Sequence, residues 1–218
     1  DENSVDEWGH DGTGRFVPYW TRDGQGQGVL EALTDYMVQS TTGAGSWYWV
    51  PKSTGKESLL DPYSYTVQGR DVMMASLVVP IMREGAFIGI AGVDLALDDL
   101  QRQVAGIRLY ESGEVTLFAG DGGIVAARDA AAVGKKVDET AAGIAADVAA
   151  GKEFHRTRRA AGGAEVLSVG VPLSVGRTAS RWMVVADIPL AEILAPVRQL
   201  ILTIAIVGIV ALAAAVGG

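Results

Sequence analysis

The chain has 218 residues and a formal net charge of −8, and it contains no cysteine. An acidic balance argues against a nucleic-acid partner, because neutralising phosphates requires a basic surface. The absence of cysteine excludes disulfides and thiolate metal sites. His10 and His155 lie far apart in the sequence and no carboxylate pattern surrounds them. We therefore expect no metal site, no cofactor and no catalytic residues.

The beginning of the chain is expected to be rich in loops and to lead into a short helix. Residues 1–28 contain many turn signals, and residues 29–39 place apolar side chains near helical spacing. The aromatic run Trp47-Tyr48-Trp49 follows, after glycines that interrupt the chain. If this run is extended, Tyr48 faces away from both tryptophans, because side chains alternate along a strand.

A hairpin and a helix are expected next. Residues 72–82 are rich in β-branched and long apolar side chains, which predicts a buried strand. A Glu-Gly pair then signals a tight turn, and residues 87–93 return as a second strand. Residues 94–104 place apolar positions at helical spacing, with Asp94 or Asp98 as the candidate N-cap.

The second half repeats this mixture of strands and helices. Residues 114–119 and 123–127 are expected strands that flank an Asp-Gly turn. Residues 141–150 form a predicted helix of small residues, and residues 165–173 and 181–188 are two further strands. Between that helix and these strands, five basic residues are expected to form a solvated turn: Lys152, His155, Arg156, Arg158 and Arg159.

An internal repeat is the most informative pattern. A strand that begins near Ser76 and contains a proline is followed by a turn, a second strand, Asp94 and a helix. The same order recurs from Ser168 to Asp187, where Asp187 is the candidate cap of a helix. Two unrelated hairpins would give this pattern by chance, but the matched proline and aspartate favour a duplication.

The repeat predicts an α+β protein built from two tandem modules of similar architecture. Each module would be an antiparallel sheet with helices on one face. We expect a first module over residues 1–105, a second over 106–190, and a juxtamembrane and membrane-spanning helix over 191–218.

The C-terminal stretch is long and apolar enough to cross a bilayer. Residues 200–218 carry no charge, and Thr203 is their only polar side chain. A bilayer core requires roughly 20 apolar residues in a helix. A buried core helix is the alternative, but such helices usually carry a polar face. We expect the helix to bend at Pro196, and we expect the chain to be a fragment cut at both ends, with residues 1–198 outside the membrane.

Several short motifs resemble the double Cache sensor domain in their order and spacing. They are Trp47-Tyr48, Pro51-Lys52, Thr54-Gly55, Asp61-Pro62-Tyr63, the strand from Ser76 to Ile81, Gly92-Val93-Asp94 and Asp121-Gly122-Gly123. The resemblance implies two stacked PAS-like modules in the periplasm, in a cell-membrane receptor that is a homodimer. Members of the family also have a long N-terminal helix and a first membrane span, which we expect to lie outside this fragment. It implies a sensory part of a chemoreceptor or, alternatively, of a histidine kinase or a cyclic-di-nucleotide enzyme.

The aromatic run and its neighbours suggest a binding site for a small molecule. Aromatic rings with a nearby carboxylate suit an ammonium group or a heterocycle. The candidate ligand contacts are Trp47, Tyr48, Lys52, Tyr63, Tyr65, Ser76 and Asp94. The structural alternatives are that two or more of the rings fill the core, that Lys52 is solvated and that Asp94 caps a helix.

The resemblance also narrows the ligand. In similar domains that bind amino acids, an arginine that holds the ligand carboxylate stands where this chain has Gly45, and an aspartate stands where it has Tyr65. The aspartate that takes the ligand amine is retained as Asp94. We therefore expect a small polar or cationic metabolite, for example an amine, and not an ordinary α-amino acid. The alternative is a module that docks a periplasmic binding protein.

Overall fold

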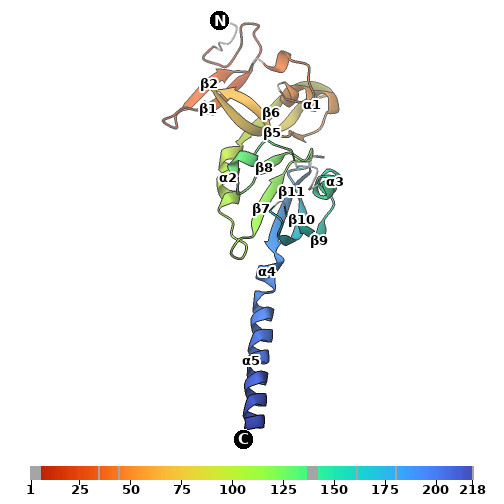
Figure 1. The fold of residues 1–218 in the computed structure, drawn as a ribbon. Coiled ribbons are helices and arrows are strands. Elements are labelled where there is room, and N and C mark those ends of the chain that lie inside the picture. Colours follow the sequence, from red (N-terminus) through yellow and green to blue (C-terminus); the bar gives the residue numbers. More distant parts are fainter. Residues whose placement is uncertain are drawn as a thin grey trace.

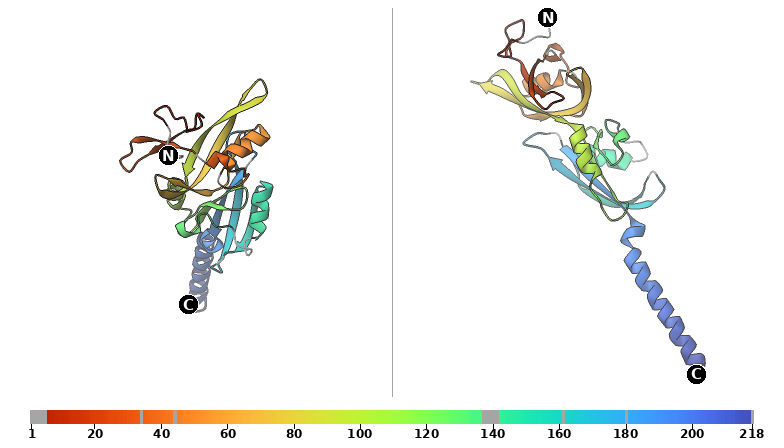
Figure 2. Two further views of the ribbon diagram at one scale, coloured as in Figure 1. Left: turned by 90° about the horizontal axis from the view of Figure 1, so that it is seen from above. Right: turned by 90° about the vertical axis from the view of Figure 1, so that its left-hand side faces the viewer.

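The computed structural model arranges the chain as two sheets stacked end to end, followed by one long helix that projects away from both (Figure 1). It describes residues 6–33, 35–43, 45–136, 142–160, 162–179 and 181–217. We call the module that lies far from the long helix the distal module and the one that leads into it the proximal module. Figure 2 shows that the N-terminal segment and the C-terminal helix lie at opposite ends of the molecule.

The distal module is a four-stranded antiparallel sheet with a separate two-stranded ribbon beside it. In the sheet, β3 and β4 follow one another along one edge of β5, and β6 pairs with the other edge. The elements are β1 (Pro18–Arg22), β2 (Gly28–Ala32), the 3₁₀ helix η1 (Asp35–Met37), α1 (Ser46–Thr54), β3 (Ser58–Leu59), β4 (Tyr63–Val67), β5 (Arg70–Arg83), β6 (Ala86–Ala96) and α2 (Leu97–Ala105).

The proximal module is a five-stranded antiparallel sheet in the order β8-β7-β11-β10-β9. Helix α3 packs against β11 on one face of this sheet. The elements are β7 (Glu114–Phe118), β8 (Ile124–Ala126), the 3₁₀ helix η2 (Ala130–Ala132), α3 (Ala142–Ala150), β9 (Phe154–Arg159), β10 (Glu165–Ser174), β11 (Arg181–Pro189), α4 (Leu190–Ile193) and α5 (Ala195–Gly217).

One hydrophobic core is shared by the two modules. Ala75 and Leu97 from the distal module pack with Val125 and Trp182 from the proximal module. Gln101 on α2 adds a polar tie, because its Oε1 accepts from the Ala127 backbone N–H at 2.9 Å and its Nε2 donates to the Ala127 carbonyl oxygen at 2.5 Å. Buried apolar surface is the main favourable term in folding, so the two modules are held as one unit.

The expected hairpins are confirmed. Glu84 and Gly85 turn the chain between β5 and β6 with positive φ angles of 51° and 81°. Such a pair of left-handed residues matches the twist of the flanking strands, and glycine adopts this conformation without steric cost. The strands expected over residues 114–119, 165–173 and 181–188 are confirmed as β7, β10 and β11 within a residue or two.

Two local predictions for the distal module are wrong. Residues 29–39 do not form a helix, because β2 pairs with β1 along its length and only the short η1 follows. The run Trp47-Tyr48-Trp49 is not extended but lies in α1. Gly45 begins that helix in a left-handed conformation, and the helix buries Trp47 and Pro51, which are four residues apart and share a face.

The expected helix caps and the expected basic turn are also wrong. Asp94 lies inside β6 and Asp187 inside β11, and neither caps a helix, because each strand continues for two more residues. The five basic residues do not form a turn, because four of them lie on β9, which pairs with β10. On that strand Arg156 forms an ion pair with Asp147 of α3.

The C-terminal helix is α5, and its residues Ala195–Val216 form a candidate membrane span by length and composition, with a mean hydropathy of 2.6. None of that span is buried against the rest of the chain. The break that we expected at Pro196 lies at Leu194, between α4 and α5. Pro196 instead occupies the first turn of α5, where its missing N–H removes no helical hydrogen bond.

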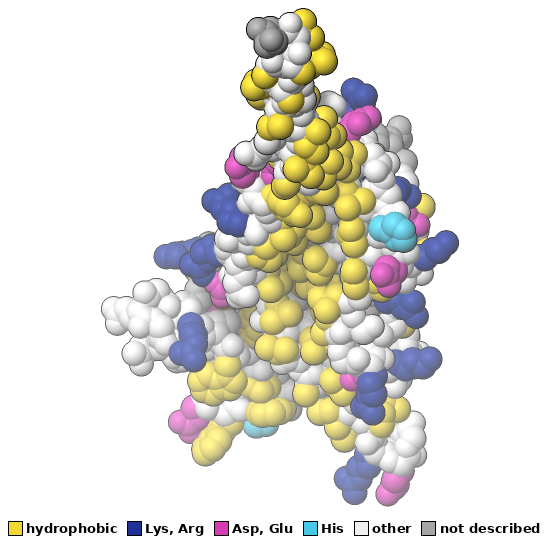
Figure 3. Space-filling view, turned by 90° about the horizontal axis from the view of Figure 1, so that it is seen from below, with side chains coloured by type: hydrophobic (Ala, Val, Ile, Leu, Met, Phe, Trp, Pro, Cys, Tyr) yellow, Lys and Arg dark blue, Asp and Glu magenta, His cyan; other side chains and the backbone are white. Residues whose placement is uncertain are grey.

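An apolar strip covers the outer face of both sheets. Figure 3 shows hydrophobic side chains that continue from the long helix along one side of the body. The exposed apolar side chains of the strands include Val79, Ile81, Val93, Val171 and Leu173. They alternate along β5, β6 and β10 with residues that point into the modules. No described residue covers them.

Candidate ligand-binding site

A chain of hydroxyl groups leads to Asp94 on the inner face of the distal sheet. The hydroxyl groups of Tyr63 and Ser76 are 2.6 Å apart, and Ser76 Oγ donates to Asp94 Oδ1 at 2.5 Å. Ser76 is fully buried and stands directly opposite Asp94 in the pairing of β5 with β6. Burial raises the pKa of the Tyr19 phenol of β1, and the Asp94 carboxylate lies close enough to raise it further. Four elements, β1, β4, β5 and β6, therefore meet at this carboxylate.

A second carboxylate and a third tyrosine extend the cluster. Tyr65 on β4 donates to Asp35 Oδ1 on η1 over 3.5 Å. The ring of Tyr65 meets the ring of Tyr19 edge to face, with centroids 6.0 Å apart, and that of Tyr63 with centroids 6.5 Å apart. The rings and carboxylates thus form one site, which we call the tyrosine–carboxylate site: Tyr19, Asp35, Tyr63, Tyr65, Ser76 and Asp94.

Partial burial raises the pKa values of Asp35 and of the three phenols in this site. Burial raises the pKa of Asp35 above the ordinary value of 3.8. It raises the pKa of Tyr63 to about 12, and it raises the pKa of Tyr19 and Tyr65 as well. The three phenols therefore stay protonated and act as neutral donors. Within the described ranges neither Asp35 nor Asp94 forms a salt bridge, so the site carries negative charge without a cation.

Tyr48 packs against the same hydrophobic cluster as Tyr63 and Tyr65, but it makes its own ring contacts with other partners, and Lys52 lies over the ring of Tyr48. Tyr48 packs edge to face on Phe87, with ring centroids 5.5 Å apart, and Lys52 Nζ lies 4.2 Å from the ring centroid of Trp49. Phe87 is seven residues from Asp94 along β6, which is roughly 23 Å in a strand. Lys52 is exposed, as the structural alternative expected, and its Nζ also lies 5.2 Å from the ring centroid of Tyr48.

Trp47 belongs to the core. It is 7% exposed, and its Nε1 has no hydrogen-bond partner among the described residues. Four of the seven predicted residues, Tyr63, Tyr65, Ser76 and Asp94, are thus linked by hydrogen bonds and ring contacts in one site, whereas Trp47 and Tyr48 share only a hydrophobic cluster with the two tyrosines. Tyr19 and Asp35 were missed. No motif marks them in the sequence, and only the pairing of β1 with β2 and the position of η1 bring them to the sheet.

The proximal module repeats this arrangement with one different partner. Ser168 is fully buried and stands directly opposite Asp187, and its Oγ donates to Asp187 Oδ1. Here the third member is Arg158 of β9, whose Nε donates to Ser168 Oγ at 2.7 Å and whose Nη2 donates to Asp187 Oδ2. The repeat seen in the sequence is thus a pair of matched serine–aspartate sites.

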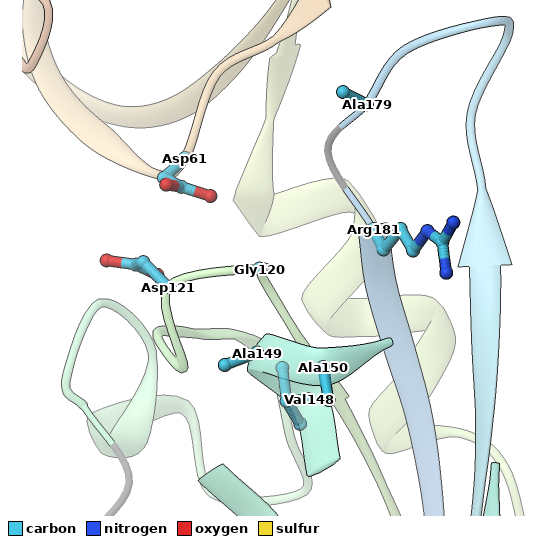
Figure 4. A pocket seen from close by; sticks show the side chains of 8 residues that line it. All are labelled: Asp61, Gly120, Asp121, Val148, Ala149, Ala150, Ala179 and Arg181. Carbon is cyan, nitrogen blue, oxygen red and sulfur yellow. The ribbon is translucent and has the colours of Figure 1, made fainter. Parts of the chain in front are cut away.

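A cavity of about 600 Å³ lies where the two modules meet. Figure 4 shows Asp61 and Asp121 on one side of it and Arg181 pointing away from both carboxylates. Burial, and then the charge of Asp121, raise the pKa of Asp61. Lys136 Nζ lies 3.2 Å from Asp121 Oδ2. Because the charged groups do not converge on one point, this cavity offers neither a catalytic constellation nor a match to the predicted ligand contacts.

Comparison with known proteins identifies the family. Residues 4–102 match the family model of the methyl-accepting chemotaxis protein-like first PDC sensor domain. The extracellular domain of mmHK1S-Z3, a protein assigned as a histidine kinase, superimposes with a TM-score of 0.73 at 31% identity, over 89% of this chain and 69% of that one. The chain belongs to the PDC, or Cache, family of extracytoplasmic sensor domains. The α+β class and the receptor family expected from the sequence are thereby confirmed.

Other relatives of this PDC sensor domain are chemoreceptors. Methyl-accepting chemotaxis protein TlpQ of Pseudomonas aeruginosa is 32% identical over 224 residues, covering 92% of this chain. The chain spans about 30% of the length of that relative. The ligand-binding domain of the Pseudomonas fluorescens chemoreceptor CtaA, solved with L-leucine, is 18% identical with a TM-score of 0.53, over 79% of this chain and 70% of that one. At that identity the likeness concerns the fold alone.

Proposed function

We propose that this PDC sensor domain binds a small organic cation, such as a protonated amine, at the tyrosine–carboxylate site of its distal module. The observation that carries the proposal is the pair Asp94 and Asp35, two partly buried carboxylates for which the described residues supply no cation. Removing a carboxylate from water is costly unless an opposite charge or several hydrogen bonds compensate. A bound cation would provide that compensation.

The surroundings of the two carboxylates suit an ammonium group. The Ser76 hydroxyl group donates to Asp94, so the position of the carboxylate is fixed before a ligand arrives. The faces of Tyr63 and Tyr65 add a favourable interaction with a cation, which strengthens when the cation is desolvated. Preorganised groups of this kind reduce the ordering cost of binding.

Among the residues that the structure describes, the same site holds no group for a ligand carboxylate. Gly45 stands where the resemblance places a carboxylate-binding arginine, and a Cβ atom at Gly45 would lie 2.2 Å from the Val38 carbonyl oxygen. A side chain therefore does not fit at this position. Lys52 is held on the ring of Trp49. An amine without a carboxylate is thus a better ligand than an α-amino acid such as the L-leucine found with CtaA.

The receptor context follows from the relatives and from α5. We infer a non-catalytic sensor that lies outside the cell membrane, spans it with α5 and signals, most simply as a homodimer, to a chemotaxis-type output. A ligand shifts such a receptor only through a difference in affinity between two states. The end of β11 leads through α4 directly into α5, so a displacement of β11 would reach the membrane helix.

A second function is favoured by one observation, the apolar strip. Exposed apolar patches often mark protein–protein contacts. A module that docks a protein partner, such as a periplasmic binding protein, would use this strip and would need no amine.

A thermal-shift screen of the whole chain in detergent micelles tests the proposal. The probes are alkyl amines, aromatic amines, α-amino acids and dicarboxylates. A ligand at 100 times its Kd adds about 2.7 kcal/mol, which raises the midpoint by roughly 5 to 11 °C for a chain of this size. We expect such a shift for amines only. A shift for dicarboxylates alone would contradict the proposal, and no shift for any probe would favour the docking function.

A further inference from the structure

Arg158 occupies a defined place in the proximal site. Its guanidinium donates to both Ser168 and Asp187, and Ser168 donates to Asp187, so the three side chains close a ring of hydrogen bonds. The side chains of Arg158 and Asp187 are each 23% exposed, whereas that of Arg159, next to Arg158, is 72% exposed. A two-point contact of this kind is among the stronger hydrogen-bonded ion pairs in proteins.

The strand register shows which distal residue corresponds to Arg158. Arg158 stands opposite the residue two positions before Ser168, and Tyr63 stands opposite the residue two positions before Ser76. Positions two apart in a strand share a face, so Tyr63 and Arg158 approach their serines from the same side. Both reach the serine hydroxyl, Tyr63 at 2.6 Å and Arg158 at 2.7 Å.

The two sites therefore share the same serine–aspartate geometry, and they differ in the charge of the third side chain. In the distal site a neutral phenol reaches the serine, and no described cation forms a salt bridge with the aspartate. In the proximal site a guanidinium reaches the serine and neutralises the aspartate. The counterpart of Tyr65 in the same register is Ala160, so the proximal site also lacks the second ring of the distal one.

We infer that Arg158 is a built-in occupant of the proximal site, a guanidinium supplied by the chain itself in the place that an organic cation takes in the distal site. The comparison with a ligand rests on the proposed function, whereas the occupancy of Asp187 does not. Two consequences follow. The wild-type chain binds one organic cation, in the distal module, and removal of the Arg158 side chain exposes a proximal site for a small guanidinium ion.

Arg158 holds a part of the proximal module that lies close to the membrane helix. Asp187 lies three residues before α4 begins at Leu190, and Arg158 ties it across β10 to β9. The proximal module is thus fixed in the form that a bound cation would produce, next to the helix that leads to α5. Only the distal module is left to respond to a cation from solution.

The test uses the whole chain in detergent micelles, in an Asp94→Asn background that removes the distal carboxylate. Methylguanidinium chloride is titrated by calorimetry, with sodium chloride at equal ionic strength as the blank. We expect Arg158→Ala to bind methylguanidinium at one site per chain, roughly tenfold or more tightly than the parent, because bonds to charged groups are worth about 1.5–3 kcal/mol. The ion should also restore part of the lost thermal midpoint.

Two controls decide whether the effect belongs to this site. Arg159→Ala changes an exposed arginine on the same strand. It should neither lower the thermal midpoint nor gain stability from methylguanidinium. Adding Asp187→Asn to Arg158→Ala should abolish methylguanidinium binding. Absence of binding in a folded Arg158→Ala chain, or equal binding by Arg159→Ala, would overturn the inference.

A second measurement covers the case in which Arg158→Ala does not fold. The wild-type chain, titrated with whichever amine binds it, should saturate at one equivalent per chain. Two equivalents would overturn the built-in occupant while leaving amine binding in place. If no amine binds the wild-type chain, the proposed function fails, whereas the methylguanidinium experiment keeps its meaning because it is made without the distal site.

Discussion

Asp35 is a carboxylate that the fold keeps partly buried without a cation. Because its pKa is raised above 3.8, the folded chain holds this proton more tightly than the unfolded chain does. The contribution of Asp35 to stability therefore increases as the pH falls from neutral toward 3.8, where the unfolded state also becomes protonated. At neutral pH the ionised Asp35 carboxylate lowers the stability of the folded chain, and a bound cation would offset this loss.

Replacing Asp35 by asparagine should therefore stabilise the empty chain and weaken the binding of an amine. The gain at neutral pH should not exceed about 1 kcal/mol, because the side chain is still partly solvated. It should shrink as the pH approaches about 4, since the aspartate becomes neutral there. Thermal midpoints of both chains across this pH range make the measurement. A variant that is less stable than the wild type at neutral pH would contradict the assignment.

The Ser76 hydroxyl group bridges Tyr63 and Asp94 by hydrogen bonds. Replacing Ser76 removes these bonds but leaves the Asp94 carboxylate in place, so it tests the hydrogen bonds apart from the charge. Ser76→Ala leaves the phenol and the carboxylate without their shared partner, which should cost about 1–3 kcal/mol of stability. The affinity for an amine should fall by a smaller factor than in Asp94→Asn, because the charge remains. Ser168→Ala makes the same change in the proximal site and should lower stability without changing that affinity. Equal losses of affinity in both variants would refute the distal assignment.

At the scale of the elements, Gly45 determines where α1 begins. It has a positive φ of 80°, and a Cβ atom there would lie 2.2 Å from the Val38 carbonyl oxygen. Gly45→Ala should therefore cost about 3 kcal/mol or more, since strain and a steric clash add. Gly43→Ala is the matched control, because Gly43 has a φ of 64° and open space around it, and should cost only about 1 kcal/mol. Chemical denaturation of the two variants measures the difference, and equal losses would contradict the steric account.

Helix α4 is tied to the loop that joins the two modules. The Glu192 carboxylate accepts from the backbone N–H groups of Glu111 at 2.9 Å and Ser112 at 3.1 Å, and the Ser112 hydroxyl also donates to it. These hydrogen bonds, with that of the Ser112 hydroxyl the strongest, lower the pKa of Glu192. The contact links the end of α2 with the start of the membrane helix.

Glu192→Ala should loosen this link locally. Hydrogen exchange at the Glu111 and Ser112 amides should become faster, because both lose their acceptor, whereas exchange in the shared core should not change. Glu165→Ala, which removes an exposed carboxylate on β10, is the control and should leave the two amides unaffected. Unchanged exchange in Glu192→Ala would show that the contact does not hold the loop.

At the scale of the whole molecule, the sequence predicts the repeated hairpins and the apolar helix well. Their patterns are local: a Glu-Gly turn, apolar strands, and nineteen residues without a charge. The matched order of strand, turn, strand and aspartate in the two halves also predicts that the modules share an architecture. Those predictions hold because neighbouring residues alone decide them.

What the sequence could not predict depends on contacts between distant segments. Residues 29–32 join β2 only because β1 offers a partner, and β9 forms only because β10 does. Asp35 reaches the site through the position of η1, and Tyr48 lies on helix α1 and not on a strand. In each case tertiary pairing overrides the local pattern.

The two modules are alike in architecture, but among the described residues only the proximal aspartate is paired with a cation. The two modules share one hydrophobic core, and β11 of the proximal module continues through α4 into α5. A displacement at the distal site could therefore be passed to α5. Amine binding at Asp94 would act from the far end, and Arg158 would keep the near end in a fixed form. The central point is therefore whether Asp94 binds the cation.

Calorimetric titration of the whole chain with the best amine from the screen, compared with Asp94→Asn and Asp71→Asn, tests this point most directly. Asp71 is an exposed aspartate on the same sheet and accepts from Thr66 Oγ1 at 2.7 Å. We predict that Asp94→Asn weakens binding roughly 30-fold or more, because a partly buried charge pair loses one member, and that Asp71→Asn leaves the affinity unchanged. An amine that binds Asp94→Asn as tightly as the wild type would contradict the proposed function.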